Sequence, residues 1–442
     1  MYSTNEIFRL REGDLYDHVQ WTYDINRRIA ARNNGSSYFT EFGWNANGNL
    51  IYNYGTYLNN TNTLDFTCAQ PVVTDWDEPT QLEYIKPLGT GEDKWPTEPS
   101  FVWTPNCIFL DPLTQFFANT TNRDAVGLVS HTFTHLELNN ATYHDALREI
   151  QFNLMYAELL NITNAAYFSG SGLIPPAITG LHNGDALRAW SDNGLWNAIG
   201  DNTRANLRNP DSYHWPKLTT MDSNGYDGYQ ITPRFATRVY YNCDQVPCDV
   251  KQWVETENGT SGGTFESILQ LERNQQGNQL FSLFHDPYMF HQPNLRQIDT
   301  DPMMVNGKMQ KLSLIQAWTE TILDELMRLV TWPIITLKHD HIAMGFAQRM
   351  VRDKCYPMIS YQTNAMTGRN ATNNATSQAI TGFTVYAGTT NECDVPIPVT
   401  IPGGVVDARG SRVEHIGTDP ETLWVQMDGS PQGFVLKTPI YT

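Results

Sequence analysis

Two histidines four residues apart are the strongest chemical signal in the sequence. His131 and His135 enclose Thr-Phe-Thr and follow the apolar run 125–130, which predicts a buried parallel strand. Two imidazoles at this spacing can bind one metal ion from a single turn. The pattern differs from the helical His-Glu-x-x-His motif of metalloproteases, because no glutamate stands between the histidines. We therefore expect a metal site; the simpler interpretation is a pair of unrelated surface histidines.

A second pair of histidines follows another apolar segment. Residues 279–284 predict a buried strand, His285 comes directly after it, and His291 comes six residues later. A histidine at the end of a strand can donate a proton to a leaving amine, because its ordinary pKa lies near neutral pH. The simpler interpretation is a histidine held by hydrogen bonds at the rim of a barrel.

Other side chains could contact a ligand, and each has a structural alternative. Tyr288 and Trp44 could stack on sugar rings, although aromatic residues more often pack in a core. Asn183 stands where a helix should begin, so capping competes with sugar contact. The segment 338–341, Lys-His-Asp-His, follows the predicted strand 332–337 and should also lie at a barrel mouth, as a ligand site or as a structural network.

Strands and helices alternate over most of the chain, which predicts parallel βαβ units and a barrel-like α/β fold. The helix after His135 has a predicted cap at Thr142, with Asp145 three residues later, and its apolar residues share one face. The expected helices are 13–33, 142–160, 183–193 and 312–330, and the expected strands are 125–130, 164–169, 195–199, 279–284 and 332–337.

The composition changes near residue 365. Residues 363–378 are polar and of low complexity, which indicates a linker or an exposed loop. Short alternating runs follow it and predict a small all-β domain. We therefore assign residues 1–365 to one α/β domain and residues 366–442 to a small β-rich domain. The expected strands of the second domain are 381–386, 395–401, 423–427 and 433–436.

Charge, cysteines and glycosylation motifs limit the environment and the partners. The formal net charge of −18 argues against nucleic acid and suits an amino-sugar polymer, although solubility alone would also explain it. No apolar run reaches the roughly 18 residues of a membrane span. Six cysteines without metal-type clustering indicate disulfides, and the simplest pairs are Cys243 with Cys248, Cys68 with Cys107, and Cys355 with Cys393.

Eight Asn-x-Ser/Thr motifs together indicate a eukaryotic secreted chain. They begin at Asn34, Asn59, Asn119, Asn140, Asn161, Asn258, Asn370 and Asn374. We expect a secreted, monomeric glycoprotein that is extracellular or associated with a cell wall.

The order of these motifs resembles that of the NodB-type polysaccharide deacetylases. His131 and His135 match the metal-binding pair of that family, and Asp201 matches its aspartate after the next strand. Residues 282–286 match its Leu-x-Leu-His segment, and residues 174–194 match the layout of its third motif. Over residues 5–360, several segments are similar to the secreted fungal exopolysaccharide deacetylases that act on galactosaminogalactan.

The resemblance implies a distorted (β/α) barrel that removes N-acetyl groups from a polysaccharide containing N-acetylgalactosamine or N-acetylglucosamine. It also implies a divalent metal, which we expect to be zinc, with cobalt or nickel as alternatives; the metal binds the acetamide oxygen and a water. His131 and His135 would bind the metal, and His285 and Asp201 would be catalytic. The substrate contacts would be His291, Asp286, Tyr288, Asn183 and Trp44.

Two departures from the family pattern leave alternatives open. The family begins with an Asp-Asp motif that supplies the general base and the third metal ligand, and this sequence contains no Asp-Asp pair. Met1 stands about where that first strand should have ended and leads into polar sequence rather than a signal peptide, so we expect an N-terminal segment to have been lost. In addition, Ile174 replaces the arginine that holds the base.

The first alternative is therefore a catalytically impaired, carbohydrate-binding relative. A glycoside hydrolase ranks last, because it needs two carboxylates in one cleft and the candidates are only Glu137, Asp201 and Asp286.

Overall fold

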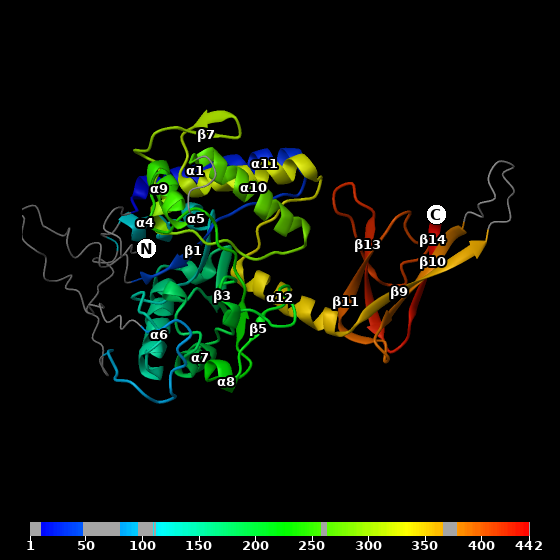
Figure 1. Cartoon of the computed structure of the whole chain (residues 1–442), viewed down its shortest axis with the longest axis horizontal. Coiled ribbons are helices and arrows are strands. Elements are labelled where there is room, and N and C mark those ends of the chain that lie inside the picture. Colours follow the sequence, from blue (N-terminus) through cyan, green and yellow to red (C-terminus); the bar gives the residue numbers. More distant parts are fainter. Residues whose placement is uncertain are drawn as a thin grey trace, which may run out of the picture.

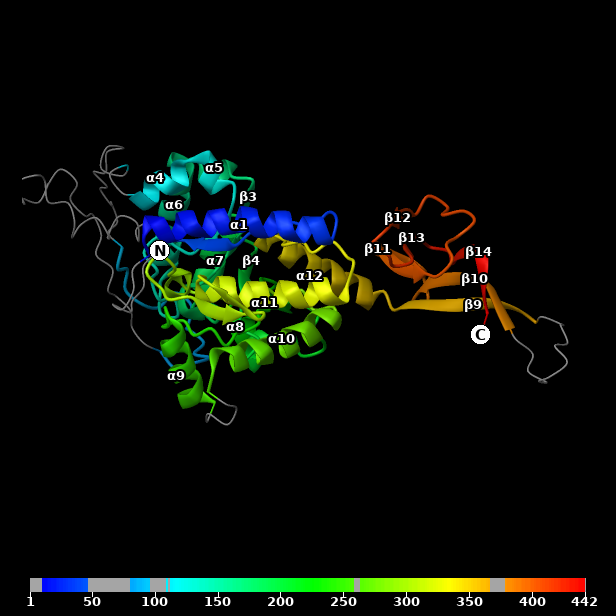
Figure 2. The ribbon, with the colours of Figure 1, turned by 90° about the horizontal axis from the view of Figure 1, so that it is seen from above.

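A computed structural model describes residues 10–46, 80–95, 109, 112–257, 263–365 and 378–441. The predicted pair Cys68 with Cys107 lies outside these residues, as do the glycosylation motifs at Asn59, Asn258, Asn370 and Asn374. An α/β part occupies most of the described chain, and β sheets follow at its C-terminal end (Figure 1). Helix α12, His339–Lys354, leads from one part to the other (Figure 2).

The α/β part is organised around a six-stranded sheet in the order β1-β2-β3-β4-β6-β5. All neighbouring pairs are parallel except β5 with β6. Parallel bridges from Ser37 to Ile335 and from Phe235 to Tyr288 add one chain segment at each side, which gives a curled half-barrel. The strands are β1 Glu41–Trp44, β2 Gly127–Ser130, β3 Tyr167–Leu173, β4 Asn197–Ile199, β5 Lys217–Leu218 and β6 Gln230–Thr232.

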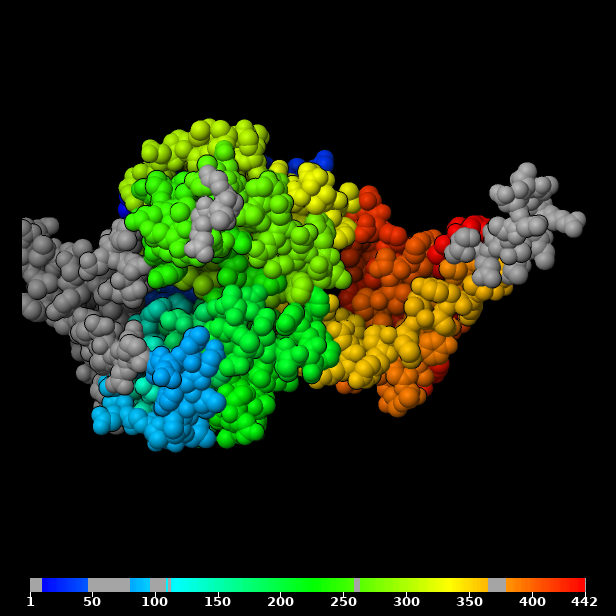
Figure 3. Space-filling model, viewed as in Figure 1, coloured from blue at the N-terminus to red at the C-terminus, as the bar shows by residue number. Residues whose placement is uncertain are grey.

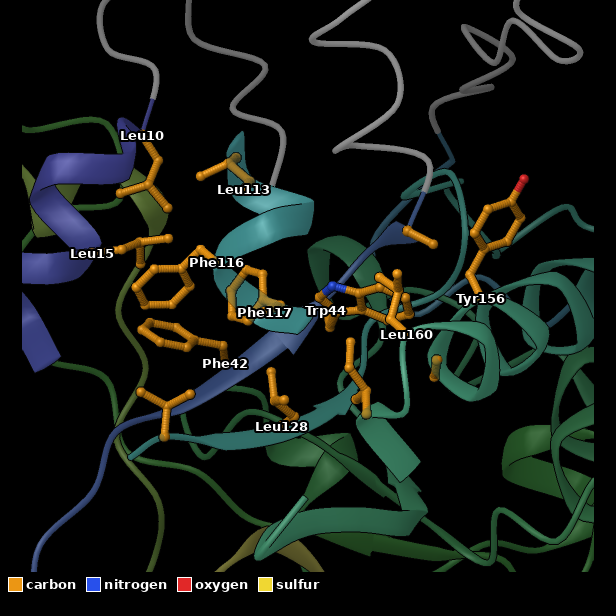
Figure 4. Packing of buried hydrophobic residues seen from close by; sticks show 14 of the residues in the cluster. Leu10, Leu15, Phe42, Trp44, Leu113, Phe116, Phe117, Leu128, Tyr156 and Leu160 are labelled. Atoms are coloured by element: carbon orange, nitrogen blue, oxygen red, sulfur yellow. The ribbon is translucent and has the colours of Figure 1, made fainter. Parts of the chain in front are cut away.

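Helices cover the half-barrel and bury its apolar surface. In the cluster beside β1 and β2, helix α1 contributes Leu15 and α4 contributes Phe116 and Phe117, all buried (Figure 4). A second buried cluster joins α1, α9, α10 and α11, and a third lies between α6, α7 and the strands. The helices are α1 Glu12–Arg32, α4 Pro112–Ala118, α5 Thr120–Arg123, α6 Tyr143–Leu159, α7 Gly184–Asp192, α8 Met221–Asn224, α9 Val246–Thr256, α10 Phe265–Phe281 and α11 Leu314–Leu329.

Most of the expected elements are confirmed, including the cap at the start of α6. The Thr142 hydroxyl accepts a hydrogen bond from the Asp145 backbone N–H at 3.1 Å. The expected strand 279–284 is wrong, because α10 continues to Phe281. A short apolar run cannot distinguish a strand from the end of a helix, and buried polar residues on α10 (Glu272 and Gln276) obscure its helical periodicity. Residues 332–337 form only the bridge at Ile335 rather than a full strand.

Two three-stranded antiparallel sheets form the C-terminal part, in the orders β14-β10-β9 and β11-β13-β12. Apolar residues from both sheets share one buried cluster, so the sheets pack face to face. This confirms an all-β region, and it adds β9, which the sequence did not predict. The strands are β9 Pro357–Ala365, β10 Gln378–Ala387, β11 Glu392–Ile401, β12 Arg412–Glu414, β13 Glu421–Asp428 and β14 Gln432–Tyr441. A separate pair, β7 Met303–Val305 and β8 Lys308–Gln310, lies in the α/β part.

The C-terminal sheets are fastened to the α/β part at two places. Cys355, at the end of α12, forms a disulfide with Cys393 on β11, as predicted. The Trp332 indole N–H donates to the Asp419 carboxylate at 2.6 Å. The space-filling view shows the two parts in contact over a limited area (Figure 3). The predicted disulfide between Cys243 and Cys248 is also present and closes a short loop before α9.

Replacing both Cys355 and Cys393 with serine should lower the free energy of unfolding of the C-terminal sheets by about 4 kcal/mol. The bond joins residues 38 positions apart, and a cross-link of that span removes much of the unfolded chain's loop-closure entropy. Calorimetric unfolding of the full chain would measure the change. The matched control is the double serine variant of Cys243 and Cys248, whose separation of 5 residues predicts a smaller loss, of about 2 kcal/mol. Equal losses in the two variants would contradict the entropic argument.

Candidate metal and active site

The predicted histidine pair lies directly after β2, at the carboxyl edge of the parallel strands. The ring centroids of His131 and His135 are 4.8 Å apart and the rings are inclined at 79°, and both side chains are half-buried. Thr132 and His135 adopt positive φ angles of 62° and 66°. Such angles are unfavourable for residues other than glycine, so the rest of the structure must hold the loop in this shape.

A fully buried carboxylate on α6 holds this loop. Glu149 accepts hydrogen bonds from the backbone N–H groups of Phe133 and Thr134, at 2.9 and 2.8 Å. The Thr134 hydroxyl and the Trp95 indole N–H, the latter at 3.0 Å, donate to the same carboxylate. Burial raises the pKa of Glu149, whereas these hydrogen bonds favour its ionised form. Three of these four donors belong to the segment between the two histidines, so the carboxylate fixes its shape.

Two asparagines connect the histidine loop to the end of β1. The Asn45 amide donates to the backbone carbonyl of Thr132 at 2.9 Å and to that of His131. The Asn153 amide group accepts from the backbone N–H of Ala46 at 2.9 Å and donates to the Ser130 hydroxyl at 2.9 Å. All these donors and acceptors are buried or half-buried, so the ends of β1 and β2 form one rigid unit with α6.

The tautomer of His131 leaves one ring nitrogen available to a ligand. Its Nδ1 lies 2.6 Å from the backbone carbonyl of Ile174, which follows β3. A carbonyl can only accept, so Nδ1 carries the proton and Nε2 keeps its lone pair, as in metal-bound histidines. Burial, followed by the charge of His135, lowers the pKa of His131 to about 3. His131 is therefore neutral at ordinary pH, which is the state that a metal ligand needs.

Asp201 and Arg234 form an ion pair at the neighbouring strand ends. Asp201 follows β4, Arg234 follows β6, and their side chains meet at 3.0 Å. The other oxygen of Asp201 accepts from the backbone N–H and the hydroxyl of Thr203, at 2.8 and 2.7 Å. Arg234 also contacts the sulfur of Met289. The sequence indicated Asp201 but gave no signal for Arg234, because nothing links it to a motif.

The structure brings His291, rather than His285, into the surroundings of His131 and His135. Burial lowers the pKa of His291 to about 4, and the charges of Arg234 and His135 contribute. His285 instead stacks on Phe346 of α12, with ring centroids 4.3 Å apart. Burial also lowers its pKa to about 4, but the charges that act on it come from Arg349 and His214.

The remaining predicted ligand contacts lie in the core or at its margin. Trp44 is 3% exposed and packs in the cluster beside β1, so it offers no surface to a sugar (Figure 4). Asn183 is fully buried; its oxygen caps α7, and its amide donates to the carbonyls of Leu138 and Ala141. Asn183 therefore has the capping role, with no surface left for a ligand.

Tyr288 and Asp286 belong to the segment that runs beside the end of β6. The Tyr288 ring packs against Trp318, with centroids 4.8 Å apart. Asp286 is 5% exposed and lines a cavity together with Phe235. Glu137, the third carboxylate considered for a hydrolase, is half-buried beyond His135.

The segment 338–341 does not reach the carboxyl edge of the sheet, contrary to expectation. The His339 backbone N–H donates to Glu41 at 2.8 Å, and the Ser169 hydroxyl donates to the same carboxylate at 2.6 Å. Glu41 is the first residue of β1, whereas the histidine pair lies beyond the last residue of β2. Burial raises the pKa of Glu41 to about 7. His339 is therefore part of a buried network at the amino ends of the strands, whereas His341 is exposed.

The described residues contain two side chains that could serve as protein ligands of a catalytic zinc ion. Such sites have three protein ligands and an open position, and His131 and His135 fit two of these by ring placement, His131 also by its tautomer. No group of three or more metal-binding side chains occurs within the described ranges. The two histidines would therefore form only part of a zinc site, as expected for a sequence that contains no Asp-Asp pair.

Among the helices of the described ranges, none is long and apolar enough to cross a membrane.

Comparison with known proteins places this half-barrel in the class of carbohydrate deacetylase domains. The chain belongs to the Agd3 deacetylase family: the profile of the Agd3 deacetylase domain matches residues 1–360, and that of the Agd3 C-terminal domain matches residues 373–440. The crystal structure of Agd3, described as a novel carbohydrate deacetylase, has 43% sequence identity and a TM-score of 0.86. The match covers 98% of this chain but only 62% of the Agd3 chain.

The other comparisons add nothing to this assignment. The crystal structure of D-threonine aldolase from Filomicrobium marinum is 10% identical over 73% of this chain and 71% of its own, and its TM-score of 0.18 carries no structural argument. None of the curated proteins matches this chain.

Replacing Glu149 with glutamine should lower the free energy of unfolding by about 2–4 kcal/mol. The new NH₂ group would face N–H and O–H donors, which leaves buried groups unpaired. Urea unfolding would measure the loss. The matched control is Glu158→Gln on the exposed side of the same helix, which should change stability by no more than about 0.5 kcal/mol. Equal stability of the two variants would show that Glu149 does not hold the loop.

Proposed function

We propose that this chain is a metal-dependent N-deacetylase that acts on an amino-sugar polysaccharide containing N-acetylgalactosamine or N-acetylglucosamine. The observation that carries the proposal is the histidine pair after β2, held rigidly with one free ring nitrogen on His131, in a chain of the Agd3 deacetylase family. We further propose zinc as the metal, because neutral imidazoles suit it, with cobalt or nickel as alternatives.

His131 and His135 would hold the ion, and Glu149 and Asn45 would position them. A zinc ion at this place would supply a water of lowered pKa and a Lewis acid for the acetamide carbonyl. Asp201 is held by Arg234 through one oxygen and by Thr203 through the other, so it would act as a fixed negative charge at the strand ends. His291 is the best-placed described histidine to pass a proton to the departing amine, because it shares its surroundings with His135 and Arg234. Its pKa of about 4 means that the ring starts neutral, so it would first take up that proton from the attacking water.

We also propose that the protein is a secreted, monomeric glycoprotein of a fungal type. Two disulfides within the described residues fit an oxidising compartment. The asparagines at positions 34, 119 and 161, which begin three of the glycosylation motifs, are exposed, and Asn140 is half-exposed. The net charge of −18 would attract a polymer that gains ammonium groups as it loses acetyl groups.

Zinc should bind the metal-stripped chain with one-to-one stoichiometry, and His131→Ala or His135→Ala should each weaken binding at least about 100-fold. Each histidine supplies one of the few ligands, so the loss of either leaves the ion poorly coordinated. Calorimetric titration would measure the affinities. The control is His415→Ala, an exposed histidine in the C-terminal part. Equal affinities for all the variants would contradict the assignment of the ligands.

Acetate release from N-acetylated polymer should require the metal and should depend on His291 more than on His285. We expect His291→Ala to lower kcat/KM by about 100-fold or more, since that is the usual effect of losing a positioned proton donor. His285→Ala should cost less than about tenfold, because this ring packs on Phe346. Enzymatic assay of acetate, with melting temperatures to confirm folding, would provide the comparison.

The other outcomes separate the alternatives. A larger loss of kcat/KM in His285→Ala than in His291→Ala would identify His285 as the proton donor. Binding of polymer without acetate release would favour an impaired, carbohydrate-binding relative. New reducing ends without acetate would favour a glycoside hydrolase.

A further inference from the structure

A cavity of about 220 Å³ lies beside the end of β6, on the face of that segment opposite to Arg234. Side chains alternate along an extended chain, so Arg234 faces Asp201 and His291 while its neighbours Pro233 and Phe235 line the cavity. The loop between β4 and β5 and the segment before Tyr288 complete the walls. The cavity is therefore close in sequence to the metal-binding site but separate from it.

Aromatic rings form much of the wall of this cavity. Phe284 lies against Phe235, with ring centroids 5.5 Å apart. Tyr213 and Trp215 come from the loop after β4, and Tyr213 is 60% exposed. The Arg208 guanidinium lies over the Tyr213 ring, 4.8 Å from its centroid. A large exposed aromatic side chain at the rim of a cavity is a surface on which a ring-shaped ligand can pack.

Polar groups in the cavity wall lack partners within the described part of the chain. Asp286 is 5% exposed, and its Oδ2 atom accepts no hydrogen bond there. The Nε atom of Arg208 is likewise buried and without a partner among these residues. Burial raises the pKa of Asp286 to about 7. A ligand that offered both a donor to Asp286 and an acceptor to Arg208 would remove the cost of leaving these groups unpaired.

We propose that this cavity binds one pyranose ring of a carbohydrate, as a second sugar site apart from the histidine pair. The space is smaller than the roughly 300–1,000 Å³ of sites for drug-sized ligands, and it suits a single ring. The C–H faces of a pyranose pack on aromatic rings such as Tyr213, and its hydroxyls both donate and accept. The inference rests on the proposed polysaccharide substrate but not on catalysis, and it gives the chain a means of holding a polymer at a unit other than the one at the metal.

The test uses the full chain in which His131 and His135 are both replaced by alanine, so that the metal-binding site is removed. Calorimetric titration with tetrasaccharides of N-acetylgalactosamine and N-acetylglucosamine, and with their de-N-acetylated forms, would detect the second site. Tyr213→Ala and Asp286→Asn in this background should each weaken binding about tenfold. The matched controls are Tyr361→Ala, a tyrosine 61% exposed on β9, and Asp211→Asn, an exposed neighbour in the same loop.

Binding that survives loss of the two histidines and is weakened by Tyr213→Ala, but not by Tyr361→Ala, would establish the site whether or not the chain releases acetate. Stronger binding of the de-N-acetylated sugars that is lost in Asp286→Asn but kept in Asp211→Asn would identify the Asp286 carboxylate as the selective group. No binding of any of these sugars, or equal effects of Tyr213→Ala and its control, would overturn the proposal. Because Tyr213 is largely exposed, its variant tests the idea even if Asp286→Asn disturbs folding.

Discussion

The histidine site depends on a single buried carboxylate. The loop after β2 must carry Thr132 and His135 at positive φ angles in order to bring the two imidazoles together, and this conformation is unfavourable without support. Glu149 supplies that support through four donors, two of them backbone N–H groups inside the loop. The cost of burying the carboxylate is offset only in this arrangement, so α6, the loop and Trp95 stabilise one another.

The charges near the strand ends follow from the same constraint of burial. His131 and His291 are kept neutral by burial and by neighbouring positive groups, whereas the Asp201 carboxylate is paired with Arg234. Neutral imidazoles and a paired carboxylate are compatible with a divalent cation, which would otherwise be repelled by protonated histidines. In the wider NodB-type pattern an arginine follows β3, where this chain has Ile174. Here Arg234, which follows β6, reaches the aspartate after β4, and the Ile174 carbonyl fixes the tautomer of His131.

The sequence predicted well what depends on local pattern. Helix α1, the Thr142 cap, the strand before His131 and two disulfides all follow from short-range rules, and the motif order predicted the family. The sequence-based predictions failed where contacts between residues distant in sequence determine the structure. The end of α10 resembled a strand because some buried positions of this helix are polar, which obscures the helical spacing of its apolar residues. One of them is Glu272, whose carboxylate accepts a hydrogen bond from the Trp318 indole N–H. Likewise, the roles of Glu149 and Arg234 depend on partners distant in sequence, which no spacing rule identifies.

The two faces of the segment after β6 relate the proposed metal site to the second cavity. Arg234 points toward Asp201 and lies near His291, while Pro233 and Phe235 turn to the aromatic cavity, so a short piece of backbone contributes to both. A rigid strand end of this kind fixes the spacing between two ligand-binding surfaces. For a repeating polymer, a fixed spacing means that a unit held in the cavity would restrict which other unit can reach the metal. The polymer's repeat and the geometry of β6, rather than the histidines alone, would then decide which acetyl groups are removed.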